Sequence, residues 1–380
     1  MSISGGFIMS LKVLHTGDIH LGMQFNSYPH SVKEKLQEAR ITVLERIVEL
    51  ANTEECNLIV VAGDLFNNTQ VDTQLIFKAV KIFDKFKGQA VLFLPGNHDY
   101  DLGQENVWRT FERKATRRML ILNDFKPYDL SDYGLEATIY PAPCDSRHSS
   151  SNNLGWIKDL EEINKNKYSI GIAHGALVGL SPDLTDNYFK MSRDELLAID
   201  LDLWLLGHSH IQYPESDNPN NKKIFNSGTP EPDGLDCKHE GFAWVITVDE
   251  NKYISAQKIK TGRYRFYDLD RNINNQQDLQ TIKEELLKGR PENKVVRLNL
   301  TGGIGEEIYN QRQKIYDDLK FKLCYLDIED DNLYIKLDHS KIEDEFTPGS
   351  FPYQFLTRLE DDEKSLHLAY ELIKEVQDEA

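Results

Sequence analysis

Short apolar runs alternate with amphipathic stretches over the first two thirds of the chain. Residues 58–62 and 90–94 are continuous apolar runs, which are typical of strands buried on both faces of a sheet. Residues 31–52 and 73–86 repeat apolar side chains near every 3.6 positions, which predicts helices that cover a sheet. Further strands are expected at residues 12–15, 169–173 and 201–206, with a hairpin at 242–248 and 253–259. The pattern predicts a layered α/β domain.

A second pattern begins near residue 264 and predicts a small α+β domain. Residues 277–287 and 306–319 have the spacing of helices, and residues 294–300 that of a strand. Residues 322–328 and 332–337 are expected to form two more strands, because a polar stretch separates them. We therefore expect three parts, which are residues 9–262, 263–340 and 341–380.

The last part is expected to be an acidic helical tail. Leu366, Tyr370 and Ile373 lie on one face of a helix predicted over residues 360–376. This face leaves two alternatives open, since it could bind a partner or fold back onto the preceding domain.

Charge and composition narrow the classes of function. The 380 residues include 44 Lys and Arg against 62 Asp and Glu, for a net charge of −18. Residues 343–380 hold 11 acids and 3 bases and so contribute −8 of it. Such a chain is not an obvious binder of nucleic acid, because phosphate contacts need Lys and Arg.

The sequence also indicates where the protein works. No apolar run approaches the ~20 residues of a transmembrane helix, so no membrane association is expected. The first ten residues lack the basic and apolar segments of a secretory signal. Four scattered cysteines without a C-x-x-C pair fit a reducing cytoplasm.

Five short polar motifs follow apolar runs, and strand ends gather at one edge of α/β sheets. They contain the candidate metal ligands Asp18, His20, Asp64, Asn97, His174, His208 and His210. Asp oxygens and imidazoles suit Mn, Fe and Zn, and the absence of thiolates argues against a structural zinc site. Seven candidates are too many for one ion but fit two ions that share a carboxylate, an arrangement that clamps a phosphate ester during hydrolysis.

The motifs resemble those of the calcineurin-like metallophosphoesterases. Within that superfamily, residues 15–22, 62–66, 96–99 and 206–210 are similar to the SbcD-type nuclease subunits of DNA double-strand-break repair complexes. Residues 295–300 and 323–328 resemble the cap domain of those subunits. The resemblance implies a four-layer β-sandwich flanked by helices, with a small α+β cap domain.

The resemblance also implies a role for each motif residue. One ion would be held by Asp18, His20, Asp64 and His210. The other would be held by Asp64, Asn97, His174 and His208, so that Asp64 bridges the two. His98 would contact the scissile phosphate and help to protonate the leaving oxygen, and Asp99 would orient His98. Asn67 would bind the substrate and help to position DNA ends; it stands where the family usually has His or Asp, which leaves the balance of exonuclease and endonuclease activity open.

The implied function is that of a manganese-dependent DNA exonuclease and endonuclease that acts in repair with an SMC-like coiled-coil ATPase. One alternative is a phosphodiesterase or phosphatase for a nucleotide or another phosphoester, which would not need the cap. Another is a non-catalytic scaffold for an ATPase, against which the intact ligand set and His98 argue. The oligomeric state stays open, with a homodimer as one alternative.

Overall fold

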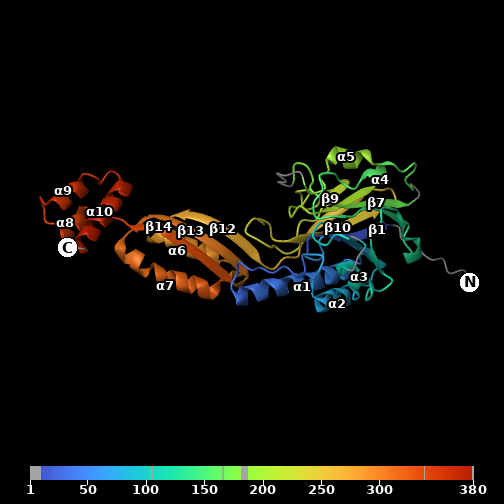
Figure 1. Cartoon of the computed structure of the whole chain (residues 1–380), viewed down its shortest axis with the longest axis horizontal. Helices are drawn as coiled ribbons and strands as arrows, with labels where there is room; N and C mark the ends of the chain where they lie inside the picture. The colour runs from blue at the N-terminus through green and yellow to red at the C-terminus, as the bar shows by residue number, and fades with distance from the viewer. Residues whose placement is uncertain are drawn as a thin grey trace, which may run out of the picture. The chain divides into compact units, whose positions relative to one another are not determined.

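The computed structural model describes residues 10–101, 103, 106–164, 167–180, 187–337 and 339–378. The chain divides into two compact units, Met1–Arg265 and Phe266–Ala380 (Figure 1). Position 9, where the first domain is predicted to begin, and positions 379 and 380 at the end of the predicted tail lie outside the described residues. The predicted division into 9–262, 263–340 and 341–380 stays a proposal.

The first unit contains a six-stranded sheet in the order β11-β10-β1-β2-β3-β4. Four of its strands are parallel: β1 (Ser10–Thr16), β2 (Leu58–Ala62), β3 (Ala90–Leu94) and β4 (Met119–Ile121). The antiparallel hairpin of β10 (Phe242–Asp249) and β11 (Ile254–Lys260) continues the sheet beside β1. β2 and β3 are buried at every position, which explains their uninterrupted apolar sequence.

A second sheet has the order β5-β6-β7-β8-β9. Its strands are β5 (Tyr128–Asp129), β6 (Ala137–Ala142), β7 (Tyr168–His174), β8 (Leu203–Gly207) and β9 (Ile224–Asn226). Strands β6 to β9 are parallel, and β5 is antiparallel to β6. Val60 and Leu92 of the first sheet share one buried cluster with Ile172 and Leu205 of the second, so the two sheets form a sandwich.

Helices cover both outer faces of the sandwich. α1 (His30–Thr53), α2 (Thr73–Phe83) and α3 (Val107–Glu112) pack on the first sheet, and α4 (Gly155–Lys158) and α5 (Arg193–Ala198) pack on the second. Figure 1 shows the two groups on opposite sides of the first unit. The predicted order of layers, helix, sheet, sheet and helix, is confirmed.

The second unit is built on a three-stranded sheet in the order β12-β13-β14. The strands are β12 (Arg265–Asn272), β13 (Lys294–Ile304) and β14 (Tyr325–Ile335). Two helices, α6 (Gln276–Leu287) and α7 (Glu306–Lys322), share the apolar core of this sheet. Each unit also contains a short 3-10 helix, at Ser131–Tyr133 in the first unit and at Pro291–Asn293 in the second.

The expectation of two strands at 322–328 and 332–337 is wrong. The structure has one strand, β14, which pairs in parallel with β13 along its length. The pairing shifts register between Asn299 and Thr301, whose partners are Glu329 and Asn332. This bulge takes up Asp330 and Asp331, so the polar stretch interrupts the register and not the strand.

The tail forms three helices, α8 (His339–Glu345), α9 (Phe351–Thr357) and α10 (Glu363–Asp378). Leu366 of α10 is buried in a cluster with Ile342 of α8 and Leu356 of α9, and Tyr370 and Ile373 pack against the same cluster. The opposite side of α10 exposes three apolar side chains, Leu368, Leu372 and Val376. The predicted face therefore packs against α8 and α9 of the tail itself. No helix within the described residues combines the length and apolar composition that a membrane crossing needs.

The position of β8 in the sandwich core gives a test of the packing. Leu205 is fully buried between the sheets, whereas Leu197 on α5 is 53% exposed. We expect Leu205→Ala to lower the free energy of unfolding by about 2–5 kcal/mol, because it leaves a cavity. The same change at position 197 should stay within about 0.5 kcal/mol. Denaturant unfolding of both variants measures the difference, and equal effects would contradict this packing.

Candidate metal centre

Strand ends from both sheets of the first unit converge on one site. The predicted ligands follow the carboxyl ends of five strands: Asp18 and His20 after β1, Asp64 after β2, Asn97 after β3, His174 at the end of β7, and His208 and His210 after β8. All seven are linked by direct contacts between their side chains. Parallel strands place their carboxyl ends at a common edge, which explains how distant motifs meet.

One part of the site surrounds two carboxylates. Asp64 Oδ2 lies 3.3 Å from His174 Nε2 and 3.7 Å from His20 Nε2. Asp18 Oδ1 lies 3.7 Å from His210 Nε2. The Nε2 atoms of His20 and His210 are themselves only 3.3 Å apart. Imidazole nitrogens and carboxylate oxygens thus face a shared space.

Asn97 joins the remaining ligands to this group. Its Oδ1 lies 3.0 Å from His174 Nε2 and 3.0 Å from His208 Nδ1. The acids and imidazoles of the site form three overlapping sets of possible metal ligands. In each set the ligand atoms lie within 4.8 Å of one another: Asp18, His20 and His210; Asp18, Asp64 and His174; and His20, Asp64 and His98. His98, predicted to be a proton donor and not a ligand, therefore has a ring nitrogen close to the side chains of two predicted ligands, His20 and Asp64.

The backbone at these positions is unusual. Asp18, His20, Asp64 and His208 have φ values of 52°, 50°, 52° and 89°. Residues other than glycine rarely adopt this left-handed region, and such strain is concentrated at functional sites. Two backbone hydrogen bonds hold the first two loops together, from Asp18 N to Gly63 O at 3.1 Å and from His20 N to Asp64 O at 2.9 Å.

Glycine is required beside the ligands because of close approach. A Cβ atom on Gly63, whose φ is +89°, would lie 1.9 Å from His174 Nδ1. That nitrogen makes a hydrogen bond with Ala62 O at 2.9 Å, which orients the ring. A Cβ atom on Gly207 would lie 1.9 Å from the same carbonyl oxygen. The motif glycines thus set the positions of the histidine rings.

Burial and close charges shift the pKa values in opposite directions. Burial raises the pKa of Asp18 to about 6 and lowers that of His20 to about 3. Burial also acts against ionisation of Asp64 and His174, but their mutual attraction outweighs it. The pKa of the Asp64 carboxyl is therefore well below its usual range, and that of His174 is raised to about 9.

The side chains present fit a pair of divalent cations. The donors are carboxylate, imidazole and amide groups, all buried except the half-buried His208 and His210, and such a set suits Mn, Fe or Zn. Within the described part of the chain, His20 Nδ1 has no hydrogen-bond partner and the four cysteines are free thiols. Cys144 lies near the site, where its thiol donates to His174 O at 3.5 Å, and burial raises the pKa of this thiol well above its usual value.

His98, Asp99 and Asn67 lie beside the ligands. The His98 N–H donates to Asp64 Oδ1 at 2.9 Å, and its ring Nδ1 lies 3.2 Å from the backbone oxygen of Asn67. The Asp99 carboxylate accepts hydrogen bonds from the N–H groups of Phe66 at 2.9 Å and Gly96 at 2.7 Å. Asp99 therefore ties together the loops after β2 and β3, and its predicted role of orienting His98 stays a prediction.

Sequence reasoning missed several neighbours of the ligands. Asp233 Oδ2 lies 3.0 Å from His210 Nδ1, and the His239 ring makes a short contact with His210 O. The Tyr188 ring packs 5.0 Å from that of His208. A single Asp between Pro232 and Gly234 is typical of a turn, so the sequence contains no signal for its role.

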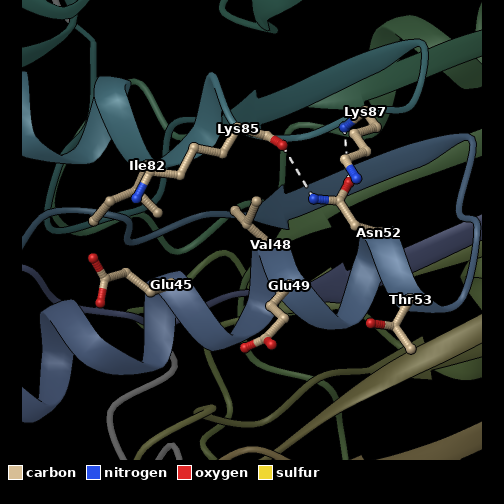
Figure 2. Close-up of a pocket in the computed structure, with 8 residues that line it drawn as sticks. All are labelled: Glu45, Val48, Glu49, Asn52, Thr53, Ile82, Lys85 and Lys87. Carbon is tan, nitrogen blue, oxygen red and sulfur yellow. Dashed lines mark hydrogen bonds between the residues drawn. The ribbon is translucent and has the colours of Figure 1, made fainter.

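A groove of about 590 Å³ lies elsewhere in the first unit, between α1 and the end of α2. Figure 2 shows Glu45, Glu49 and Asn52 on its α1 side, and the Asn52 side chain makes hydrogen bonds with the backbone of Lys85 and Lys87. None of the predicted site residues lines this groove.

The contact of Gly63 with His174 gives a test. Gly63→Ala should push the His174 ring from its position and weaken Mn²⁺ binding by about 10–100-fold, the range typical for loss of groups that orient metal ligands. Gly134→Ala is the matched control, since its φ is +76° and nothing lies near its added Cβ. The control should cost about 1–2 kcal/mol of stability and leave Mn²⁺ affinity unchanged in calorimetric titration. Equal Mn²⁺ affinity in both variants would contradict the packing.

Three known proteins have sequences similar to that of this chain. The chain is 27% identical over 213 residues to the uncharacterized metallophosphoesterase YhaO of Bacillus subtilis, covering 53% of this chain and 49% of that protein. It is 25% identical to the D subunit of the nuclease SbcCD of Staphylococcus saprophyticus, over 55% and 58% of the two chains. It is 23% identical to the DNA double-strand break repair protein Mre11 of Methanopyrus kandleri, over 58% and 48%. The chain spans about half the length of these curated relatives.

Two solved structures are also similar. TT1561 of Thermus thermophilus matches with a TM-score of 0.39 and 11% identity, over 65% of this chain and 98% of the other. A dimetal phosphatase from Danio rerio matches with a TM-score of 0.33 and 10% identity, over 66% and 99%. The family model of the calcineurin-like phosphoesterases matches residues 11–212, which include every side chain of the predicted ligand set. The chain belongs to the calcineurin-like phosphoesterase family.

Proposed function

We propose that this chain is a two-metal phosphodiesterase that cleaves DNA, with Mn²⁺ as its most suitable ion. The observation that supports it best is the position of Asp64, whose one carboxylate oxygen is in reach of both His20 and His174. His20 and His174 belong to different sets of possible ligand atoms. A carboxylate in this position can be shared by two ions.

The proposed ligand sets divide the site between these ions. Asp18, His20, Asp64 and His210 would hold one, and Asp64, Asn97, His174 and His208 the other. When bound, the two ions would supply charge to the non-bridging phosphate oxygens and lower the pKa of a water nucleophile. The left-handed backbone at four of these residues fits a site held in a fixed arrangement before the substrate binds.

His98 is proposed to act on the substrate. Its backbone N–H is bonded to Asp64, which places the imidazole next to the ligands, and its Nδ1 faces the Asn67 carbonyl. If Nδ1 donates to that carbonyl, Nε2 carries the lone pair in the neutral ring and the proton in the imidazolium. The protonated ring can give its Nε2 proton to the leaving oxygen of the ester.

DNA is favoured as the substrate by two of the relatives, which are named as a nuclease subunit and a break-repair protein. By the same analogy we propose an SMC-like coiled-coil ATPase as the partner and DNA repair in the cytoplasm as the setting. A homodimer stays an alternative. Free cysteines fit a reducing compartment. The second candidate is hydrolysis of a nucleotide or another phosphoester, which the acidic net charge of −18 favours.

Assays on several substrates test the proposal. Purified chain with Mn²⁺ is mixed with labelled single- and double-stranded DNA, with bis(p-nitrophenyl) phosphate as a small diester, and with a nucleotide monophosphate. We expect cleavage of DNA and of the small diester. DNA cleavage alone should fall steeply with salt, because only DNA contacts release counterions. Hydrolysis of the nucleotide without cleavage of DNA would overturn the proposal in favour of the second candidate.

A substitution at His98 separates metal binding from proton transfer. His98→Gln should lower kcat for DNA by about 10²–10⁴-fold, the usual contribution of general acid catalysis. Mn²⁺ content should stay at the wild-type level because His98 is proposed not to be a ligand. Equilibrium dialysis against Mn²⁺ measures this content. Loss of one ion per chain would identify His98 as a ligand, in line with its place beside His20 and Asp64.

A further inference from the structure

The two ring nitrogens of His210 face different surroundings. Nε2 lies 3.7 Å from Asp18 Oδ1 and 3.3 Å from His20 Nε2, inside the ligand cluster. Nδ1 lies 3.0 Å from Asp233 Oδ2, on the side away from the cluster. The Asp233 side chain is only 7% exposed. A buried carboxylate thus contacts the nitrogen that does not face the other ligands.

Asp233 has a second charged neighbour. Arg40 Nη2 lies 3.6 Å from Asp233 Oδ2, and the Arg40 side chain is 1% exposed. A buried guanidinium is costly unless it is paired with an acid. Within the described residues, Arg40 Nε and Nη2 have no hydrogen-bond partner, so the pairing with Asp233 is electrostatic.

Arg40 also reaches the turn that carries two of the ligands. Its Nη1 donates to Ile19 O at 3.3 Å, and Ile19 lies between Asp18 and His20. The same nitrogen donates to Thr229 Oγ1 at 3.3 Å, and that hydroxyl lies 3.0 Å from Asp18 O. Arg40 therefore links the loop of Asp233 to the turn of Asp18 and His20.

We propose that Asp233 is a positioning residue, which holds the His210 ring so that Nε2 faces the metal ion, while Arg40 holds Asp233. A carboxylate that accepts from Nδ1–H fixes the ring's tautomer and orientation and makes Nε2 a better ligand. This inference rests on the proposed function, since it concerns the ion held by Asp18, His20, Asp64 and His210. Asp233 contacts a ligand and not the substrate.

Calorimetric titration of Mn²⁺ tests the proposal. Asp233→Asn removes the charge with little change in size, and we expect one of the two ions to bind about 10–100-fold more weakly. The other ion should bind as in the wild type. Glu231→Gln is the matched control, because Glu231 is buried in the same loop but accepts from the backbone N–H groups of Arg263 and Tyr264. It should leave both Mn²⁺ affinities unchanged.

A double-mutant cycle shows whether Asp233 acts through His210. In the His210→Ala background, Asp233→Asn should change Mn²⁺ affinity by less than about twofold, because the group it orients is gone. The same fold-loss in both backgrounds would overturn the proposal, as would unchanged affinity in the single variant. A wild-type chain that binds no Mn²⁺ would contradict the proposed function itself, whereas two bound ions with an unaffected Asp233→Asn overturn only the role of Asp233.

A spectroscopic measurement needs no change at Asp233, and it decides the matter if Asp233→Asn does not fold. Histidine ¹⁵N spectra of the wild-type chain loaded with Zn²⁺ distinguish a metal-bound nitrogen from a protonated one, and His210→Asn identifies the signals. We expect Nδ1 of His210 to carry the proton and Nε2 to bind the ion. A spectrum with Nδ1 bound to the ion would overturn the proposal.

Discussion

The rest of the site depends on the close packing around the Asp64 carboxylate. Its side chain is 2% exposed and lies between His20 and His174. A Cβ atom on Gly96 would come within 2.2 Å of its Oδ1, and one on Gly63 would strike His174. The loops after β2 and β3 therefore need glycine at these two positions. The left-handed φ values of Asp18, His20 and Asp64 accompany this close approach.

This crowding brings two acids and several imidazoles into one buried volume. Attraction between Asp64 and His174 lowers the pKa of the carboxyl and raises the pKa of the imidazole, whereas burial raises the pKa of Asp18 and lowers the pKa of His20. The network extends outward through His210 to Asp233 and Arg40, which are also buried. Two large apolar clusters, one on each face of the first sheet, offset the cost of burying this polar centre.

The sequence predicted those parts of the fold that depend on local pattern. β2 and β3 have the predicted bounds because they are buried on both faces and end at glycine-containing motifs. The seven proposed ligands could be named from the sequence because each follows a strand whose end lies at the common edge, and the structure brings their side chains together. The sequence pattern predicts two strands in place of β14, because Asp330 and Asp331 interrupt the alternation of apolar and polar residues. A bulge accommodates these two residues within one strand, which a period-2 pattern cannot indicate.

The residues that support the site could not be predicted in the same way. Asp233 and Arg40 are 193 positions apart in the chain and meet only through the tertiary fold. Arg40 lies within an amphipathic helix, where a basic residue is normally solvated. The loop contacts of Asp99 with Phe66 and Gly96 likewise depend on how the ends of β2 and β3 converge. Tertiary contacts of this kind have no periodic signal.

The central claim is that two metal ions share the Asp64 carboxylate, and the stoichiometry of Mn²⁺ binding tests this claim most directly. Titration of the metal-free chain, followed by the electron paramagnetic resonance of free Mn²⁺, should show two ions bound per chain. The spectrum of the bound ions should show spin coupling between them. Asp64→Asn should remove the coupling and weaken both ions, because a shared ligand serves each. One ion per chain, or two uncoupled ions that Asp64→Asn leaves unchanged, would contradict the account.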